Sequence, residues 1–255
     1  MQISLRGIHK EFPRQAGGRL PVLRDVTLTV GAEEFCCVVG ASGCGKSTIL
    51  NIVAGLTLPD AGQVLVDGAH LDSRRLRIGY VFQKPRLLNW RTVRDNVAFS
   101  LRAAGVSPAE AREKALHHLG MVGLDQFADE FPLALSGGMQ QRVAIARALA
   151  IEPDLLLMDE PFSHLDEMTA RALRAELLRI WERARKPVMF VTHNALEAVY
   201  LADKVLILSG RPATILKSVH VELPRHREME DPRLVELQRE ILQTLGIVPA
   251  DAVRH

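Results

Sequence analysis

The chain has 255 residues, of which 47% are apolar, enough for one large α/β domain or two small ones with a buried core. The formal net charge is only +2 and the short basic clusters are scattered, so we expect no nucleic-acid-binding surface. The longest segment without Asp, Glu, Lys or Arg spans residues 47–59, which is too short to cross a bilayer. Three cysteines and no leader-like start indicate a chain that stays in a reducing compartment.

The first third of the chain predicts strands around one helix. We expect strands within residues 3–28, divided by a loop at 13–18, then a buried strand at 35–39, a helix at 47–56, an alternating strand at 62–68 and a strand at 78–82. The alternating pattern is typical of a small antiparallel sheet. A helical insertion follows from about residue 85 to 135, with a strong helix start at Ser107, where proline comes next and glutamate three residues later.

The remainder alternates between helices and strands. We expect a helix after Ser136 and another from 173 to 184, strands at 155–158, 188–191 and 205–208, a helix at 195–202 and a final helix at about 232–246. Strands alternating with helices favour a mainly parallel sheet whose ligands lie at the carboxyl ends of the strands. The prediction is one α/β domain over 1–255 with a parallel sheet core, a small antiparallel subdomain and the helical insertion.

A glycine-rich turn with P-loop spacing connects the strand at 35–39 to the helix that follows it. Its glycines let successive backbone N–H groups converge on a phosphate at the positive end of a helix. Lys46 would reach the β- and γ-phosphates of ATP, and the hydroxyl of Ser47 would bind Mg²⁺. The alternative is a glycine-rich strand-to-helix turn that contains Lys-Ser by chance. For Cys44 we expect a space-filling role rather than that of a reactive thiol. The predicted nucleotide-binding residues are Gly40, Ala41, Ser42, Gly43, Cys44, Gly45, Lys46, Ser47 and Thr48.

Two carboxylates end the apolar strand at 155–158. Asp159 would organise the Mg²⁺ ion, and Glu160 would polarise the attacking water. Acidic residues at strand ends are often only turn formers, but the apolar run that leads to them weakens that interpretation. A glutamate directly after the aspartate favours a hydrolase over a P-loop kinase.

The segment 135–142, Leu-Ser-Gly-Gly-Met-Gln-Gln-Arg, stands just ahead of that strand. With it, the sequence resembles the ATP-binding cassette (ABC) family over nearly its whole length, which implies a P-loop NTPase fold and ATP hydrolysis. Ser136 caps a helix, and Gly137 and Gly138 leave the first N–H groups of that helix bare for a γ-phosphate. In the family this signature, here including Gln140, completes the site of the opposite subunit, so two ATP molecules lie between two copies.

Further site residues follow from the resemblance alone. Gln83 matches the glutamine that touches Mg²⁺ and the attacking water, His193 matches the histidine at the γ-phosphate, and Phe12 matches the aromatic residue that stacks on adenine. The alternative is that Phe12 is core, since an aromatic residue on a strand is more often core. Residues 163–166 match a loop at the dimer contact. His164 and Asn194 depart from the family pattern, and we expect Asn194 to cap its helix as well as aspartate would.

Within the family, residues 83–90, Ser209-Gly210-Arg211-Pro212 and Leu223-Pro224-Arg225 resemble the nitrate, sulfonate and taurine importers. That group implies a permease dimer in the membrane and an external solute-binding protein. The region from residue 85 to about residue 90 would form part of a groove for a short permease helix, although Leu87, Leu88 and Trp90 could instead be core of the insertion.

The sequence therefore predicts an ATPase that binds ATP and Mg²⁺ as a homodimer and drives a permease from the cytoplasmic face of the membrane. A non-transport ABC ATPase acting on DNA or ribosomes is the main alternative, but the coiled-coil insertions, zinc-binding cysteines or second cassette typical of that class are missing from the sequence. A P-loop kinase and an inactive scaffold are weaker alternatives. The sequence does not identify the solute.

Overall fold

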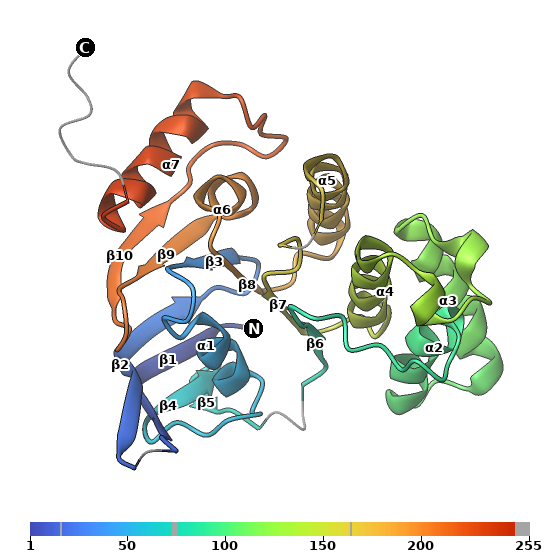
Figure 1. Cartoon of the computed structure of the whole chain (residues 1–255), viewed down its shortest axis with the longest axis horizontal. Coiled ribbons are helices and arrows are strands. Elements are labelled where there is room, and N and C mark those ends of the chain that lie inside the picture. The colour runs from blue at the N-terminus through green and yellow to red at the C-terminus, as the bar shows by residue number, and fades with distance from the viewer. Residues whose placement is uncertain (16, 73–75, 164, 248–255) are drawn as a thin grey trace. The chain divides into compact units, whose positions relative to one another are not determined.

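The structure, a computed structural model, describes residues 1–15, 17–72, 76–163 and 165–247. The chain divides into two compact units. The first combines Met1–Asp72 with Pro187–His255, and the second is Ser73–Lys186. Figure 1 shows the elements of both.

The first unit contains the predicted antiparallel sheet. Its strands run in the order β2-β1-β4-β5 and all pair antiparallel. On β1, Ile3, Leu5 and Ile8 are fully buried, which gives the sheet its apolar face. The strands are β1 (Ile3–Pro13), β2 (Arg19–Val30), β4 (Ala61–Val66) and β5 (Ala69–His70).

A second group of strands in this unit is mainly parallel, as predicted. The middle strand β3 (Phe35–Val39) pairs in parallel with β8 (Val188–Thr192) and β9 (Lys204–Leu208). Every residue of β3 and β8 is buried, which explains their continuous apolar sequences. The antiparallel strand β10 (Ile215–His220) pairs with β9 and was not predicted, because most of its residues are exposed and polar residues interrupt it.

Three helices complete the first unit: α1 (Lys46–Val53), α6 (Ala195–Leu201) and α7 (Pro232–Thr244). Figure 1 shows α6 and α7 on one side of β3 and β9 and α1 on the other. The helix α1 ends earlier than expected because Gly55 adopts φ +71°, a left-handed conformation that stops a helix. Asp231 caps α7 by accepting a hydrogen bond from the Arg233 N–H.

A buried arginine holds the C-terminal end of α6. The guanidinium of Arg227 is almost fully buried and donates to backbone carbonyls that the end of a helix and a following loop leave without partners. Burial lowers the pKa of Arg227 to about 10, so the side chain stays charged at neutral pH and suits the negative end of the helix dipole. The acceptors are the carbonyl oxygens of Val199 (2.8 Å), Tyr200 (3.2 Å), Ala202 (2.6 Å), Val221 (3.3 Å) and Leu223 (2.9 Å).

The second unit pairs β6 (Ile78–Val81) in parallel with β7 (Leu155–Asp159) and otherwise consists of helices. Ser107 caps α3 as predicted, since its Oγ accepts a hydrogen bond from the Glu110 N–H at 3.4 Å. The helices are α2 (Val93–Ala103), α3 (Pro108–Met121), η2 (Asp125–Phe127), η3 (Pro132–Ala134), α4 (Gly137–Ala150) and α5 (Glu167–Ala184).

The segment between β6 and α2 is a loop rather than the start of a helix at about residue 85. Asn96, whose side chain is fully buried, organises this loop. Its Nδ2 donates to the carbonyl oxygens of Leu88 (3.1 Å), Arg91 (3.2 Å) and Thr92 (2.9 Å), and its Oδ1 accepts from the Leu88 N–H at 2.7 Å. These bonds satisfy the backbone groups that a helix would otherwise pair. Among the described residues, no helix is both long and apolar enough to span a membrane.

We expect Arg227→Met to lower the free energy of unfolding by at least about 3 kcal/mol, because five carbonyl groups lose a donor and each one left buried without a partner costs about 1–3 kcal/mol. Urea unfolding measures this loss. The matched control is Arg233→Met at the start of α7, where the side chain is exposed and pairs with Asp231 at 2.8 Å. Equal losses in the two variants would contradict the anchoring role of Arg227.

Candidate functional site

The predicted site residues fall into two groups, one in each compact unit. Phe12, residues 40–48 and His193 belong to the first unit. Gln83, Asp159, Glu160 and the segment 136–140 belong to the second.

The phosphate loop at 40–45 needs its glycines for conformation and for space. Gly43 has φ +73° and Gly45 has φ +128°, values that residues with a side chain rarely adopt. A Cβ atom on Gly45 would come within 2.8 Å of Leu23 Cδ2, and one on Gly40 within 2.9 Å of Cys44 Sγ. Cys44 is buried, consistent with the predicted space-filling role.

Lys46, at the first position of α1, lies against the loop. Its side chain is only 4% exposed, and its Nζ donates to the carbonyl oxygens of Gly40 (2.9 Å) and Ala41 (3.1 Å). The helix begins without a side-chain cap, so its first N–H groups and the positive end of its dipole face the loop. Ser47 follows with an exposed side chain. This loop has the charge and the amide donors that a nucleotide phosphate needs.

Arg211 contacts the same loop, which the sequence analysis did not anticipate. Its Nη2 donates a hydrogen bond to the carbonyl oxygen of Gly43. The segment that carries it is tied to β2, because the Arg24 N–H donates to the Ala213 carbonyl at 2.9 Å and the Ala213 N–H to that of Val22 at 2.8 Å. The motif Ser209-Gly210-Arg211-Pro212 had served only as a mark of the importer group.

Phe12 and His193, the other predicted residues of this unit, both have exposed side chains. Phe12 is 36% exposed and Lys10 Nζ lies 5.3 Å from the centre of its ring, so the alternative that Phe12 is core is wrong. Asn194 caps α6 as predicted, with its Oδ1 accepting hydrogen bonds from the N–H groups of Leu196 (3.0 Å) and Glu197 (3.2 Å).

In the second unit, Asp159 is the last residue of β7 and is 8% exposed. Burial, together with the nearby charge of Asp159, raises the pKa of Tyr80 on the neighbouring strand well above its usual value. Glu160 has φ +44°, an unfavourable conformation for a residue with a side chain. Its carbonyl oxygen accepts hydrogen bonds from the Ser163 N–H (3.2 Å) and Oγ (2.9 Å), which hold the turn.

Gln83 lies two residues beyond β6, with an exposed side chain, rather than at the end of the strand itself. The loop that carries it is held by helix α4. Gln141, which is buried, donates through its Nε2 to the Phe82 carbonyl oxygen at 3.2 Å. The sequence gives no sign of this contact between residues 59 positions apart.

Helix α4 begins at the signature segment. The Oγ of Ser136 accepts from the Met139 N–H at 3.3 Å, so the Ser136 hydroxyl caps the third position of the helix. Gly137 and Gly138 occupy the first two positions, whose N–H groups have no acceptor within a helix. The side chain of Gln140 turns back and donates to the carbonyl oxygens of Pro132 (3.0 Å) and Leu135 (3.2 Å). Its side chain therefore shapes this loop.

The loop expected at the dimer contact is only partly described, and His164 lies outside the described residues. Asp166 caps α5, since its Oδ1 accepts from the Thr169 N–H at 2.9 Å. Helix α5 therefore begins at Glu167, earlier than expected.

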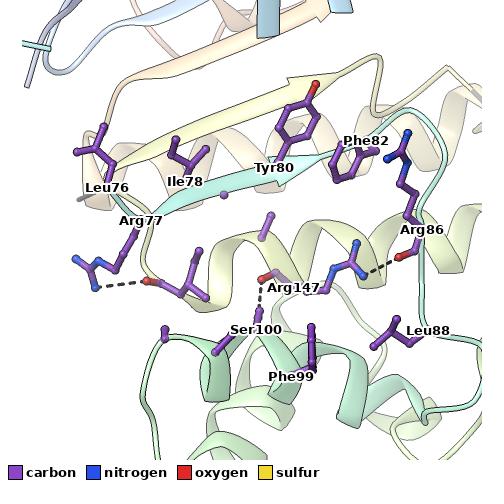
Figure 2. Close-up of a pocket in the computed structure, with 15 residues that line it drawn as sticks. Leu76, Arg77, Ile78, Tyr80, Phe82, Arg86, Leu88, Phe99, Ser100 and Arg147 are labelled. Carbon is purple, nitrogen blue, oxygen red and sulfur yellow. Dashed lines mark hydrogen bonds between the residues drawn. The ribbon is translucent and has the colours of Figure 1, made fainter. Parts of the chain in front are cut away.

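A groove of about 600 Å³ lies on the second unit, shown in Figure 2. Its walls come from β6, the loop after it, α2 and the end of α4, and they include Tyr80, Phe82, Leu88 and Phe99. The sequence left undecided whether Leu87, Leu88 and Trp90 line the groove or belong to the core. Leu87 packs against the helical core, Leu88 lines the groove, and Trp90 is 75% exposed.

Comparison with known proteins decides the family. Residues 23–163 match the family described as ABC transporter. The chain belongs to this family. ATP binding and an ATPase activity are characteristic of ABC proteins, and the nucleotide-binding fold is that of a P-loop NTPase.

Several ABC proteins are similar over most of their length. The chain is 44% identical over 245 residues to the nitrate import ATP-binding protein NrtD of Synechococcus elongatus, covering 93% of this chain and 89% of NrtD. It is 47% identical over 230 residues to the aliphatic sulfonates import ATP-binding protein SsuB 2 of Burkholderia lata, covering 90% and 82%. The dimeric, post-hydrolysis structure of the ATP-binding cassette MJ0796 bound to ADP and Pi is 33% identical with a TM-score of 0.79, covering 87% of this chain and 100% of that one.

We expect Gly45→Ala to weaken ATP binding by at least about tenfold, which corresponds to about 1.4 kcal/mol. The added methyl group would overlap Leu23 and strain the backbone, and the loop would shift to relieve that strain. Equilibrium titration with a fluorescent ATP analogue measures the effect. Gly210→Ala is the matched control, since a Cβ atom there meets nothing within 4 Å. Unchanged affinity in Gly45→Ala would show that this backbone conformation is dispensable.

Proposed function

We propose that the chain is the ATP-hydrolysing subunit of an importer for small anionic solutes such as nitrate, sulfonates or taurine. It would act as a homodimer on a separate permease, with all 255 residues working as one ABC-type domain. One observation carries the nucleotide chemistry: glycines shape the starts of two helices, since Gly45 precedes α1 and gives it no side-chain cap, and α4 begins with Gly137 and Gly138 after the Ser136 cap. The similarity to importer subunits named for nitrate and sulfonates supports the transport role.

In this proposal the loop 40–48 holds the phosphates of ATP. Lys46, already 2.9 Å from a loop carbonyl, turns its ammonium toward the β- and γ-phosphates, a stronger partner than a neutral carbonyl. Phe12, exposed on β1, stacks on the adenine ring. The affinity for ATP then comes mainly from backbone amides and the buried ammonium of Lys46. The preference for a purine base comes from the ring of Phe12.

The oxygen-bearing side chains of Ser47, Gln83 and Asp159 are the proposed Mg²⁺ ligands or the partners of its bound water. Hydroxyl, amide and carboxylate oxygens are the donors that this hard cation prefers. Among the described residues no three His, Cys, Asp or Glu side chains form a metal cluster. When bound, Mg²⁺ neutralises charge on the β- and γ-phosphates.

Hydrolysis needs a base for water. We assign this role to Glu160, which follows Asp159 at the end of β7 in a turn fixed by Ser163. Glu160 accepts a proton as the water oxygen bonds to the γ-phosphorus, and the bond from that phosphorus to the β–γ bridging oxygen breaks to leave ADP and phosphate. His193, exposed just before α6, donates to the γ-phosphate and Gln83 orients the water.

The second proposed step is closure of the dimer. The bare N–H groups of Gly137 and Gly138 in one copy bind the γ-phosphate held by the other copy, so closure depends on ATP. Hydrolysis removes these contacts and the dimer opens. The dimeric structure of a similar cassette supports this arrangement.

The groove on the second unit is the proposed docking site for a short helix of the permease. Its apolar walls and open form suit a helix-in-groove contact, and its neighbour Trp90 offers an exposed apolar ring. The chain would then lie at the cytoplasmic face of the membrane, with a solute-binding protein on the opposite side. An ABC ATPase acting on DNA or ribosomes is not favoured, because the similar proteins are named as import subunits.

We expect Ser136→Arg to abolish ATP hydrolysis while the affinity for ATP stays within about threefold of wild type. The long side chain would fill the space between the Gly137 and Gly138 amides and the γ-phosphate bound by the other copy. The Glu160→Gln variant should retain bound ATP. In sedimentation with ATP, this variant should be a dimer, and the double variant Glu160→Gln/Ser136→Arg should be a monomer. Ser136→Ala, the control, loses a cap worth about 1 kcal/mol but leaves the amides open, so hydrolysis should persist. Normal hydrolysis by Ser136→Arg would refute the shared site.

Solute-stimulated hydrolysis tests the transport role. The chain, co-purified with its permease and solute-binding protein in lipid vesicles, should hydrolyse ATP several-fold faster with one of nitrate, taurine or an alkanesulfonate. A neutral sugar serves as the control. No stimulation by any anion of the panel would contradict the proposed solute class.

A further inference from the structure

The signature helix α4 also holds the loop that follows β6. Arg147, near the end of α4 remote from Ser136, donates through Nη2 to the Pro85 carbonyl and through Nη1 to the Arg86 carbonyl, both at 2.9 Å. Gln141, on the same helix, donates to the Phe82 carbonyl at 3.2 Å. Two side chains of α4 thus bond three carbonyl groups between residues 82 and 86, the segment that contains Gln83.

The held loop forms one wall of the groove. The guanidinium of Arg86 lies 4.3 Å from the centre of the Phe82 ring, and that ring stacks on Tyr80 at 4.1 Å. Figure 2 shows this row of side chains above Arg147, which reaches from α4 to the backbone of Arg86. Any chain that enters the groove therefore meets a wall whose backbone is bonded to α4.

Arg147 is suited to hold a fixed position. Burial lowers the pKa of its guanidinium, yet an arginine remains charged at neutral pH even so. Its two donors engage neighbouring carbonyls at the same time, which a lysine cannot reproduce because it lacks the planar fork. Helix α2 approaches the same residue from the other side, since Ser100 Oγ donates to the Arg147 carbonyl at 3.0 Å.

We infer that Arg147 is a positioning residue that links the permease groove to the nucleotide chemistry. Through Arg147, a displacement of the loop 82–86 moves α4, whose opposite end carries the amides of the signature. Gln83 moves with the loop itself. Helix α4 has 14 residues and is therefore about 21 Å long, so a rigid helix can carry a shift over that distance. This inference rests on the proposed docking of a permease helix in the groove.

The test compares Arg147→Gln, Arg147→Lys and Ser100→Ala in the complex with permease and solute-binding protein. We expect Arg147→Gln to reduce the solute-stimulated kcat by about tenfold with the KM for ATP changed less than about threefold, a coupling effect of ordinary size. Arg147→Lys should fall between, as one carbonyl keeps a donor. Ser100→Ala removes a bond to the same residue but leaves the loop held, so stimulation should stay within about twofold of wild type.

Hydrogen exchange on the isolated chain separates positioning from misfolding. In Arg147→Gln the peptide covering 82–92 should exchange at least about tenfold faster, while the peptides from β7 and β8 exchange as in wild type. Equal stimulation and equal exchange in Arg147→Gln and wild type would overturn the inference. If wild-type protein itself shows no stimulation by permease and solute, the proposed function fails instead, and the exchange result still decides whether Arg147 holds the loop.

Discussion

Irregular backbone in a folded protein must find hydrogen-bond partners, and the loops beside the proposed chemistry meet this constraint with arginine. Arg211 donates to the phosphate loop, Arg147 to the loop that carries Gln83, and Arg227 to the end of the helix that follows His193. Each guanidinium offers several donors in a fixed plane and cannot lose its charge near neutral pH. Two loops and one helix end, whose backbone groups regular secondary structure does not pair, are thereby held in one conformation.

The same constraint explains where anions can bind. Carbonyl groups of these loops are satisfied by side chains, whereas α1 begins without a side-chain cap and α4 begins with two glycines after the Ser136 cap. Gly45 before α1 and Gly137 and Gly138 in α4 have no side chain that could cover the backbone amides. A protein that provides donors for its own carbonyls and places glycines at these helix starts is prepared for a phosphate before any nucleotide arrives.

Features written in short stretches of sequence could be predicted, and contacts between distant residues could not. The strands β3 and β8, the Ser107 cap and the Asn194 cap follow from apolar runs or from adjacent residues, so local physics determines them. By contrast, Arg211 and Gly43 are 168 positions apart, and Arg147 and Arg86 are 61 apart. The loop from about residue 85 to residue 92 was predicted as helix, because nothing in the sequence marks Asn96 as the buried residue that pairs the backbone of this loop. Only the fold brings such partners together.

The chain contains two tryptophans in opposite surroundings. Trp181 is 4% exposed, with its indole N–H bonded to the Lys186 carbonyl at 2.7 Å and Arg185 over its ring, whereas Trp90 is 75% exposed a few residues from the groove. Water-soluble quenchers of fluorescence should reach the second ring and not the first. The protein thus carries an intrinsic optical label on the face where a membrane partner would settle, with a shielded reference signal in the same polypeptide.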